Sequence, residues 1–190
     1  MDGPDLDPAR RLAYWKGVLD GVPEELKLPA DRLRLAVASY RGSRADVAVP
    51  GALHRSLTAL AEAHGVPLGA VLRAGLAALL YRLGAGGDIP VGSAAPWGAG
   101  EEADRAVGCG GDLRVTRIDL SDDPTTTRLL DRLREAELGA ARHGDVPFGQ
   151  LVAELAPGPH PAVHPLFQIA LTLGGTAASA AGLLELPGVR

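Results

Sequence analysis

The side chains best suited to acid–base chemistry lie near residue 143. His143 and Asp145 are two residues apart, and a neighbouring imidazole and carboxylate could in principle form a polarised pair. The same positions also have a structural explanation, because a histidine near the end of a helix interacts favourably with the carbonyl dipole. Asp145 is equally well placed to cap a helix that opens at Pro147. We favour the structural roles and predict no catalytic residue in this chain.

The other histidines and the single cysteine do not predict a metal site or a nucleophile. His160 and His164 are four residues apart, but a proline follows each, so no helix can present both on one face as a zinc site would need. His54 and His64 fall off the apolar stripe of their predicted helices, which favours solvated positions. Cys109 lies among glycines with no histidine or acid placed to activate it, which favours an ordinary thiol.

The stretch around these residues predicts a helix, a loop and a buried strand. Pro147 suits the first helical position, because the N–H that it lacks would have no partner there. Apolar residues then recur at helical spacing, at Phe148, Leu151, Val152 and Leu155. Residues 164–173 are a nearly continuous apolar run of strand length, entered through Pro165. This run indicates a strand buried on both faces.

Apolar spacing and the placement of Gly and Pro predict the elements upstream. Helices are expected from residue 8 to about 20, with Asp7 as the cap, and over residues 51–64, 67–83 and 124–142, with Asp123 as the cap of the last. Strands are expected at residues 44–49, at 89–94 and in a segment that ends near residue 120. The order of these elements favours a layered α/β architecture.

Length and composition limit the classes of function. A chain of 190 residues suits one domain with a real core, and we expect residues 1–7 to be a flexible lead and 8–190 to form the domain. A net charge of −4 gives no basic footprint for nucleic acid. The apolar stretches fall short of the roughly 18 residues that a membrane span needs. A single cysteine and no signal-peptide pattern favour a cytoplasmic location.

Two motifs carry a resemblance to a known family. His143-Gly-Asp145-Val-Pro147-Phe148, followed by His164-Pro165-Leu166-Phe167-Gln168-Ile, resembles two late motifs of the condensation domains of nonribosomal peptide synthetases. Those domains join two carrier-bound acyl groups through an amide bond. Upstream, Tyr14-Trp15 and Leu28-Pro-Ala-Asp-Arg32 resemble the segment that links the two lobes of such a domain. The family usually continues with Pro-Arg-Pro, where this chain has Leu33-Arg34-Leu35.

The resemblance covers roughly residues 10–188 and implies a fold. It matches most of the C-terminal lobe of a condensation domain, which is one half of a chloramphenicol-acetyltransferase-like pair. The implied lobe has a mixed sheet with helices packed on it, and it would be incomplete at its C-terminus. The family signature His-His-x-x-x-Asp-Gly belongs to the N-terminal lobe, and no histidine of this chain stands in that pattern. The motif residues named above are therefore expected to be structural.

The resemblance also indicates where a substrate tunnel would run. The family carries Val-Gly-Thr-Pro beside the tunnel, where this chain has Val-Gly-Ser93-Ala, and a second wall segment has become Cys-Gly-Gly-Asp112. Ser93 and Asp112 are therefore the tunnel candidates. If the large apolar side chains of that wall are normally buried, their loss costs several kcal/mol. The loss suggests that this surface no longer packs as it does in an intact condensation domain.

Two hypotheses about function remain open. The first is a non-catalytic partial condensation domain that serves as a scaffold or docking surface for a carrier protein, a neighbouring synthetase domain or a tailoring enzyme. The second is one half of a split or excised enzyme, with the catalytic histidine supplied by another lobe. No cofactor is expected to bind directly, although the phosphopantetheine arm of a carrier protein could enter the tunnel. A lone lobe exposes the apolar face that its partner would cover, which predicts self-association or a stable complex.

Overall fold

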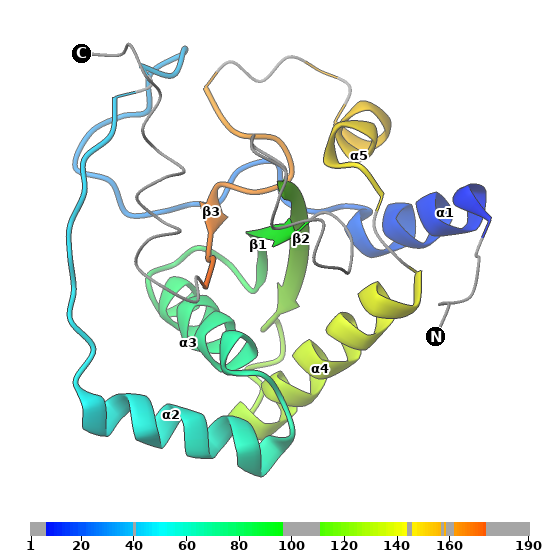
Figure 1. The fold of residues 1–190 in the computed structure, drawn as a ribbon. Helices are drawn as coiled ribbons and strands as arrows, with labels where there is room; N and C mark the ends of the chain where they lie inside the picture. The colour runs from blue at the N-terminus through cyan, green and yellow to red at the C-terminus, as the bar shows by residue number, and fades with distance from the viewer. Residues whose placement is uncertain are drawn as a thin grey trace.

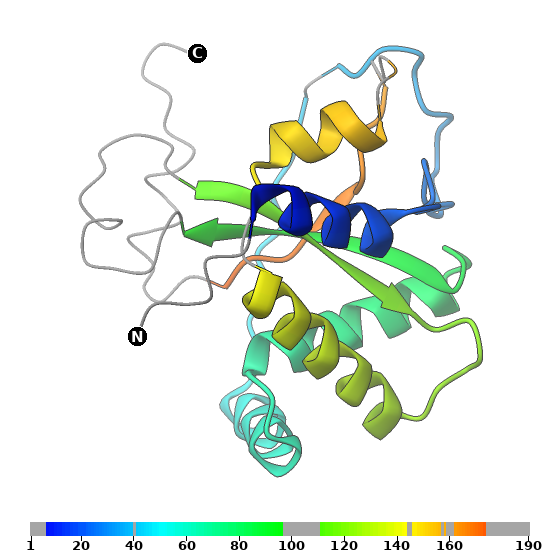
Figure 2. The same ribbon diagram turned by 90° about the vertical axis from the view of Figure 1, so that its right-hand side faces the viewer.

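The computed structural model describes residues 7–39, 41–96, 111–143, 146–156, 158 and 162–173. The helices are α1 (Pro8–Leu19), α2 (Gly51–His64), α3 (Leu68–Arg82), α4 (Thr126–His143) and α5 (Phe148–Leu155), and the strands are β1 (Asp88–Pro96), β2 (Gly111–Asp119) and β3 (Ile169–Ala170). A small mixed sheet lies between α1 and α5 on one face and α3 and α4 on the other (Figure 1, Figure 2). The predicted α/β class, with helices packed on a mixed sheet, is therefore confirmed.

The first three helices begin and end where local signals predict. The Asp7 side chain accepts a hydrogen bond from the Ala9 N–H at 3.1 Å and caps α1. Gly65 ends α2 in the left-handed conformation, at φ 60°, which glycine adopts without steric cost. Pro67 then lies immediately before α3, where its missing N–H is not needed.

The predicted start of α4 is wrong by two residues. Asp123 does not cap a helix that begins at residue 124; it lies in a turn at φ 49°, and its N–H bonds the Leu120 carbonyl at 3.1 Å. The helix instead begins at Thr126, and the Thr125 hydroxyl accepts from the Arg128 N–H at 3.4 Å. Asp123 therefore belongs to the turn after β2, and Thr125 caps α4 in its place.

The sheet has β1 at its centre. β1 and β2 form an antiparallel ladder in which Val91 pairs with Thr116 and Ser93 with Arg114. β3 pairs with the other edge of β1 in parallel, so that the strand order is β2-β1-β3. Because directly opposed residues project from the same face, Val91 and Thr116 face α3 and α4, and Val115 faces α1 and α5.

Two of the predicted strands are wrong in whole or in part. Residues 44–49 are extended but form no ladder, and Val47 is 86% exposed, because no strand lies beside them in the described part of the chain. In the run 164–173 only Ile169–Ala170 is a strand, and it is not buried on both faces. Leu166, at φ 65°, bends the chain before it can pair with β1.

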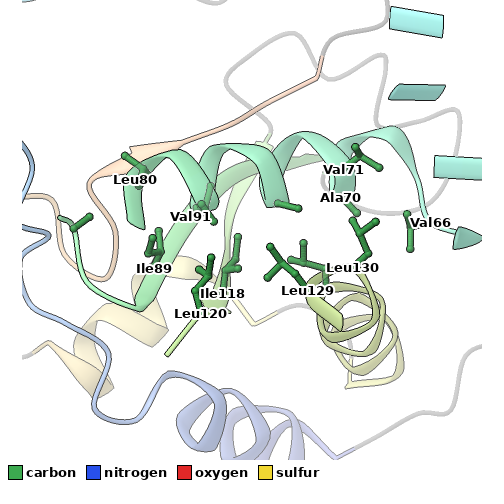
Figure 3. Close-up of a cluster of buried hydrophobic side chains, with 14 of the residues drawn as sticks. Val66, Ala70, Val71, Leu80, Ile89, Val91, Ile118, Leu120, Leu129 and Leu130 are labelled. Carbon is green, nitrogen blue, oxygen red and sulfur yellow. The ribbon is translucent and has the colours of Figure 1, made fainter. Parts of the chain in front are cut away.

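The core lies in two clusters, one on each face of the sheet. The larger cluster joins Ile89 and Val91 of β1 and Ile118 of β2 to α3 and to Leu129 and Leu130 of α4 (Figure 3). The smaller cluster joins α1 and α5 to the opposite face through residues that include Trp15, Val115, Leu151 and Phe167.

No single helix of the described residues is long and apolar enough to cross a membrane. Together, α2 and α3 have the length and composition of a membrane span, but the two helices meet at a bend of 106°.

Candidate functional site

The two late motifs meet in space as an aromatic cluster. Phe148, at the first residue of α5, has its ring centroid 5.5 Å from that of His164 and 5.6 Å from that of Phe167. His164 and Phe167 are 4.3 Å apart, and the His164 Nδ1 lies 3.1 Å from the Phe167 carbonyl oxygen. Leu166 and Phe167 are buried, and Pro165 is half-buried. Phe148, Leu166 and Phe167 pack in the core around α5, whereas His164 is exposed and lines, with Pro165 and Leu166, a cavity of about 290 Å³ at the end of α5.

Gln168 joins this cluster to the segment that follows α1. Its side-chain oxygen accepts from the Leu26 N–H at 2.9 Å, and its side-chain nitrogen donates to the carbonyls of Glu24 at 3.2 Å and His164 at 3.1 Å. The ring of Phe167 lies directly over Gly92, where a Cβ would come within 2.6 Å of the Phe167 Cδ2 and Cζ atoms. Because Gly92, in the Val-Gly-Ser sequence, has no Cβ, it leaves the space that the Phe167 ring occupies.

His143 is the last residue of α4, which is the position that the predicted interaction with the helix carbonyls needs. Its Nδ1 lies 2.8 Å from the Gly139 carbonyl, and its ring stacks on Tyr14 of α1 at 3.8 Å with an angle of 2°. Burial raises the pKa of the Tyr14 phenol above its ordinary value of 10.0. Asp145 lies outside the described residues, and Pro147 is exposed immediately before α5, which has no side-chain cap there.

The described residues contain no cluster of three or more His, Cys, Asp or Glu side chains that could hold a metal ion. His54 is exposed, and His64 is half-buried at the end of α2. Cys109 and His160 lie outside the described residues, so the predictions for both stay predictions.

A cavity of about 340 Å³ follows the edge of β2 between α1 and α4. Ser93 is among its lining residues, which places this tunnel candidate beside an open space. Asp112 pairs through its backbone with Ala95 at the same end of the ladder, but its side chain lies outside what the structure describes. The lining also contains Arg73 of α3 and Glu137 of α4, which form an ion pair. Sequence reasoning missed this pair, because its members are 64 residues apart.

Arg117 of β2 fixes α1 against the sheet. Its Nη2 lies 2.7 Å from an Asp88 carboxylate oxygen, and its Nη1 donates to the carbonyls of Val18 at 3.0 Å and Asp20 at 2.6 Å. The hydrogen bond to Asp88 raises the pKa of the guanidinium further above its usual range. Arg117 therefore satisfies carbonyls at the C-terminal end of α1 that would otherwise lack partners.

Comparisons with known proteins agree with this arrangement. The family model for the condensation domain matches residues 7–179. The chain is 44% identical over 180 residues to a probable nonribosomal peptide synthetase, CymA, of Salinispora arenicola, and 42% identical over 175 residues to a dimodular nonribosomal peptide synthase of Bacillus subtilis. These matches cover 93% and 92% of this chain but only 2% and 7% of the relatives. The chain thus corresponds to a small part of each relative.

Solved structures give the same result. The X-domain from teicoplanin biosynthesis superposes with a TM-score of 0.81 at 30% identity, over 88% of this chain and 37% of that one. The X-domain in complex with OxyB superposes with a TM-score of 0.77, also at 30% identity, over 86% of this chain and 36% of that one. The family match over most of the chain is decisive: this chain belongs to the condensation-domain family.

Proposed function

We propose that this chain is the C-terminal lobe of a condensation domain, one half of a chloramphenicol-acetyltransferase-like pair. We further propose that by itself it acts as a scaffold or docking surface in nonribosomal peptide synthesis and not as a catalyst. Its partner would be a carrier protein, a neighbouring synthetase domain or a tailoring enzyme. The order of the motifs along the chain and the match to the condensation domain over residues 7–179 support the assignment to this lobe.

The observation that carries the docking role is the exposed segment before α2, residues 33–39 and 41–50, which forms no helix or strand. Its apolar side chains face solvent: Leu33 is 95% exposed, Leu35 64%, Val37 61% and Val47 86%. Exposed apolar side chains that are as closely spaced as Leu33, Leu35 and Val37 favour an interaction site. The likeness to the X-domain, whose structure in complex with OxyB has been solved, is consistent with a lobe that binds another protein.

The arrangement of the histidines supports a lobe that is not catalytic alone. No histidine of the chain stands in a His-His-x-x-x-Asp-Gly sequence, and none of those in the described residues forms an ion pair with a carboxylate. His143 uses its Nδ1 on a backbone carbonyl, and so does His164. These contacts fix the orientation of each ring, and neither ring is paired with a carboxylate among the described residues that would support it as a general base.

A split enzyme is the second candidate, because Ser93 lines a cavity of about 340 Å³. In this version another lobe supplies the catalytic histidine, and Ser93 and Asp112 face the shared tunnel. The phosphopantetheine arm of a carrier protein would then enter between the lobes. Amide formation by the pair, but not by this chain alone, is the property that separates this candidate from the docking role.

Affinity purification from the native host, followed by mass spectrometry and size-exclusion chromatography of the purified pair, tests the docking role. We expect a carrier protein, synthetase domain or tailoring enzyme to form a stoichiometric complex. The triple substitution Leu33→Ser, Leu35→Ser and Val37→Ser should weaken that complex about tenfold or more, since it removes the exposed apolar side chains. Leu138→Ser, at a site on α4 that is 47% exposed, is the matched control and should bind normally.

The other outcomes are equally specific. Co-purification of a lobe with His-His-x-x-x-Asp-Gly, with amide formation by the mixture, would establish the split enzyme instead. A homodimer that the triple substitution dissociates would identify the segment as a self-association surface. A monodisperse monomer with no partner, at high concentration, would refute the docking role.

A further inference from the structure

The cavity beside β2 has an apolar wall and a cationic wall. α1 and α4 supply Trp15, Val18, Ala136 and Ala140, while the sheet and α3 supply most of the polar groups. Its volume of about 340 Å³ is in the range of small-molecule sites, which are typically about 300–1,000 Å³. Such sites are mostly apolar with a few polar groups that fix the orientation of the ligand. The cavity therefore has the size and the lining of a ligand site.

Charge in the lining favours an anion. Three arginines, Arg73, Arg114 and Arg117, face a single lining carboxylate, that of Glu137. Arg117 is occupied by Asp88, whose carboxylate offsets its charge, and by the carbonyls of Val18 and Asp20, so it contributes neither net charge nor a free donor. A partly closed space with this excess of positive charge raises the local concentration of small anions.

Arg73 is the lining residue with an unmet donor. Its side chain is 16% exposed and its Nη2 donates to Glu137, yet its buried Nε has no hydrogen-bond partner in the described part of the chain. A buried N–H of a charged group that lacks an acceptor is costly, and an arginine presents its donors in a fork that matches the oxygens of carboxylates and phosphates. An oxyanion beside Arg73 would supply the missing acceptor.

We propose that this cavity binds a small organic molecule that carries a carboxylate or a phosphate, with Arg73 holding the oxyanion and the apolar part lying against Trp15. Glu137 holds the Arg73 guanidinium through Nη2, and a small turn of this side chain toward the cavity would bring its buried Nε to the ligand. Ser93 and Thr116 line the same space and offer hydroxyls to the polar end. The proposal is independent of the docking function, because the purified chain needs no protein partner to bind such a molecule.

Tryptophan fluorescence tests the proposal directly. The chain has two tryptophans, so the Trp97→Phe variant leaves Trp15 as the only reporter. Phenylacetate and phenyl phosphate are the oxyanion probes, and phenylacetamide is the neutral control of the same shape. We expect saturable quenching, with at least one oxyanion bound about tenfold or more tightly than the amide, as charged hydrogen bonds typically discriminate. Which oxyanion binds more tightly identifies the ligand class.

Three variants, each made in the Trp97→Phe protein, test whether the probes bind in this cavity. Arg73→Met should abolish the preference for the oxyanion, and Ala136→Leu, which fills the cavity and changes no charge, should weaken all probes. Arg134→Met, with a half-exposed side chain on α4 that does not line the cavity, should bind as the parent does. Equal affinity for phenylacetate, phenyl phosphate and phenylacetamide, or no saturable quenching, would overturn the proposal. If circular dichroism shows Arg73→Met unfolded, the oxyanion preference and Ala136→Leu decide the question.

Discussion

Replacing Gly92 with alanine should destabilise the fold through a single side chain, Phe167. A Cβ at Gly92 would overlap the Phe167 Cε2 atom and would lie 2.6 Å from Cδ2 and Cζ, well below van der Waals contact. Phe167 is only 6% exposed, so its ring cannot swing into solvent to relieve the overlap. Overpacking of this kind costs about 1–3 kcal/mol. We expect the free energy of unfolding of Gly92→Ala to fall by that amount.

Urea denaturation followed by far-UV circular dichroism measures this loss, and a double-mutant cycle locates it. Phe167→Ala alone should cost about 3–5 kcal/mol, because it empties a buried site. In that background Gly92→Ala should cost little, so the two changes should be non-additive by about 1–3 kcal/mol. Gly75→Ala is the matched control: Gly75 is exposed on α3, a Cβ added there would meet no atom within 4 Å, and alanine should stabilise by up to about 1 kcal/mol.

Two results would refute this reasoning. The first is a Gly92→Ala variant within about 0.5 kcal/mol of the parent, the range of ordinary surface substitutions. The second is strict additivity in the cycle, which would mean that the destabilisation arises in the strand itself and not in contact with Phe167.

Three further predictions concern single contacts. Arg117→Met should lower the free energy of unfolding by about 1.5–3 kcal/mol, because it removes charged hydrogen bonds to two α1 carbonyls; urea denaturation checks this. Ser121→Ala should reduce stability near neutral pH but not in acid. The hydrogen bond from the Ser121 hydroxyl lowers the pKa of Asp119 below its ordinary value of 3.8, so its contribution is present above that value and is lost as pH falls through the folded pKa, whereas the bond from the Ser121 N–H remains in the variant. Stability of both proteins across about pH 2–7, a window chosen to span that change, measures the difference. Gln168→Leu should cost about 1–3 kcal/mol, because it leaves the Leu26 N–H without its acceptor and the Glu24 and His164 carbonyls without their donor; thermal unfolding of the variant beside the parent checks it.

Elements that depend on local signals were predictable from the sequence. α2 ends at Gly65 and α3 begins after Pro67, because glycine admits the left-handed conformation and proline suits a helix start regardless of what lies around them. The central strand β1 was predicted within two residues at its C-terminal end, since its apolar run has the length of a buried strand.

Elements that need a distant partner were not predictable in the same way. Residues 44–49 alternate as a strand does, but a strand exists only where a neighbouring strand completes its hydrogen bonds. The run 164–173 is apolar enough for a buried strand, yet the backbone at Leu166 and the contact of Phe167 with Gly92 reduce the paired part to Ile169–Ala170. In both cases tertiary context overrides the local pattern.

Residues that are close along the chain carry the family resemblance, most of the helix boundaries and the absence of the His-His-x-x-x-Asp-Gly signature. The contacts of Tyr14 with His143 and of Arg73 with Glu137 exist only in the folded chain. Nothing in the spacing of these residues encodes either contact, since each depends on how separate helices pack on the two faces of one sheet. The cavity beside β2 is a consequence of that packing.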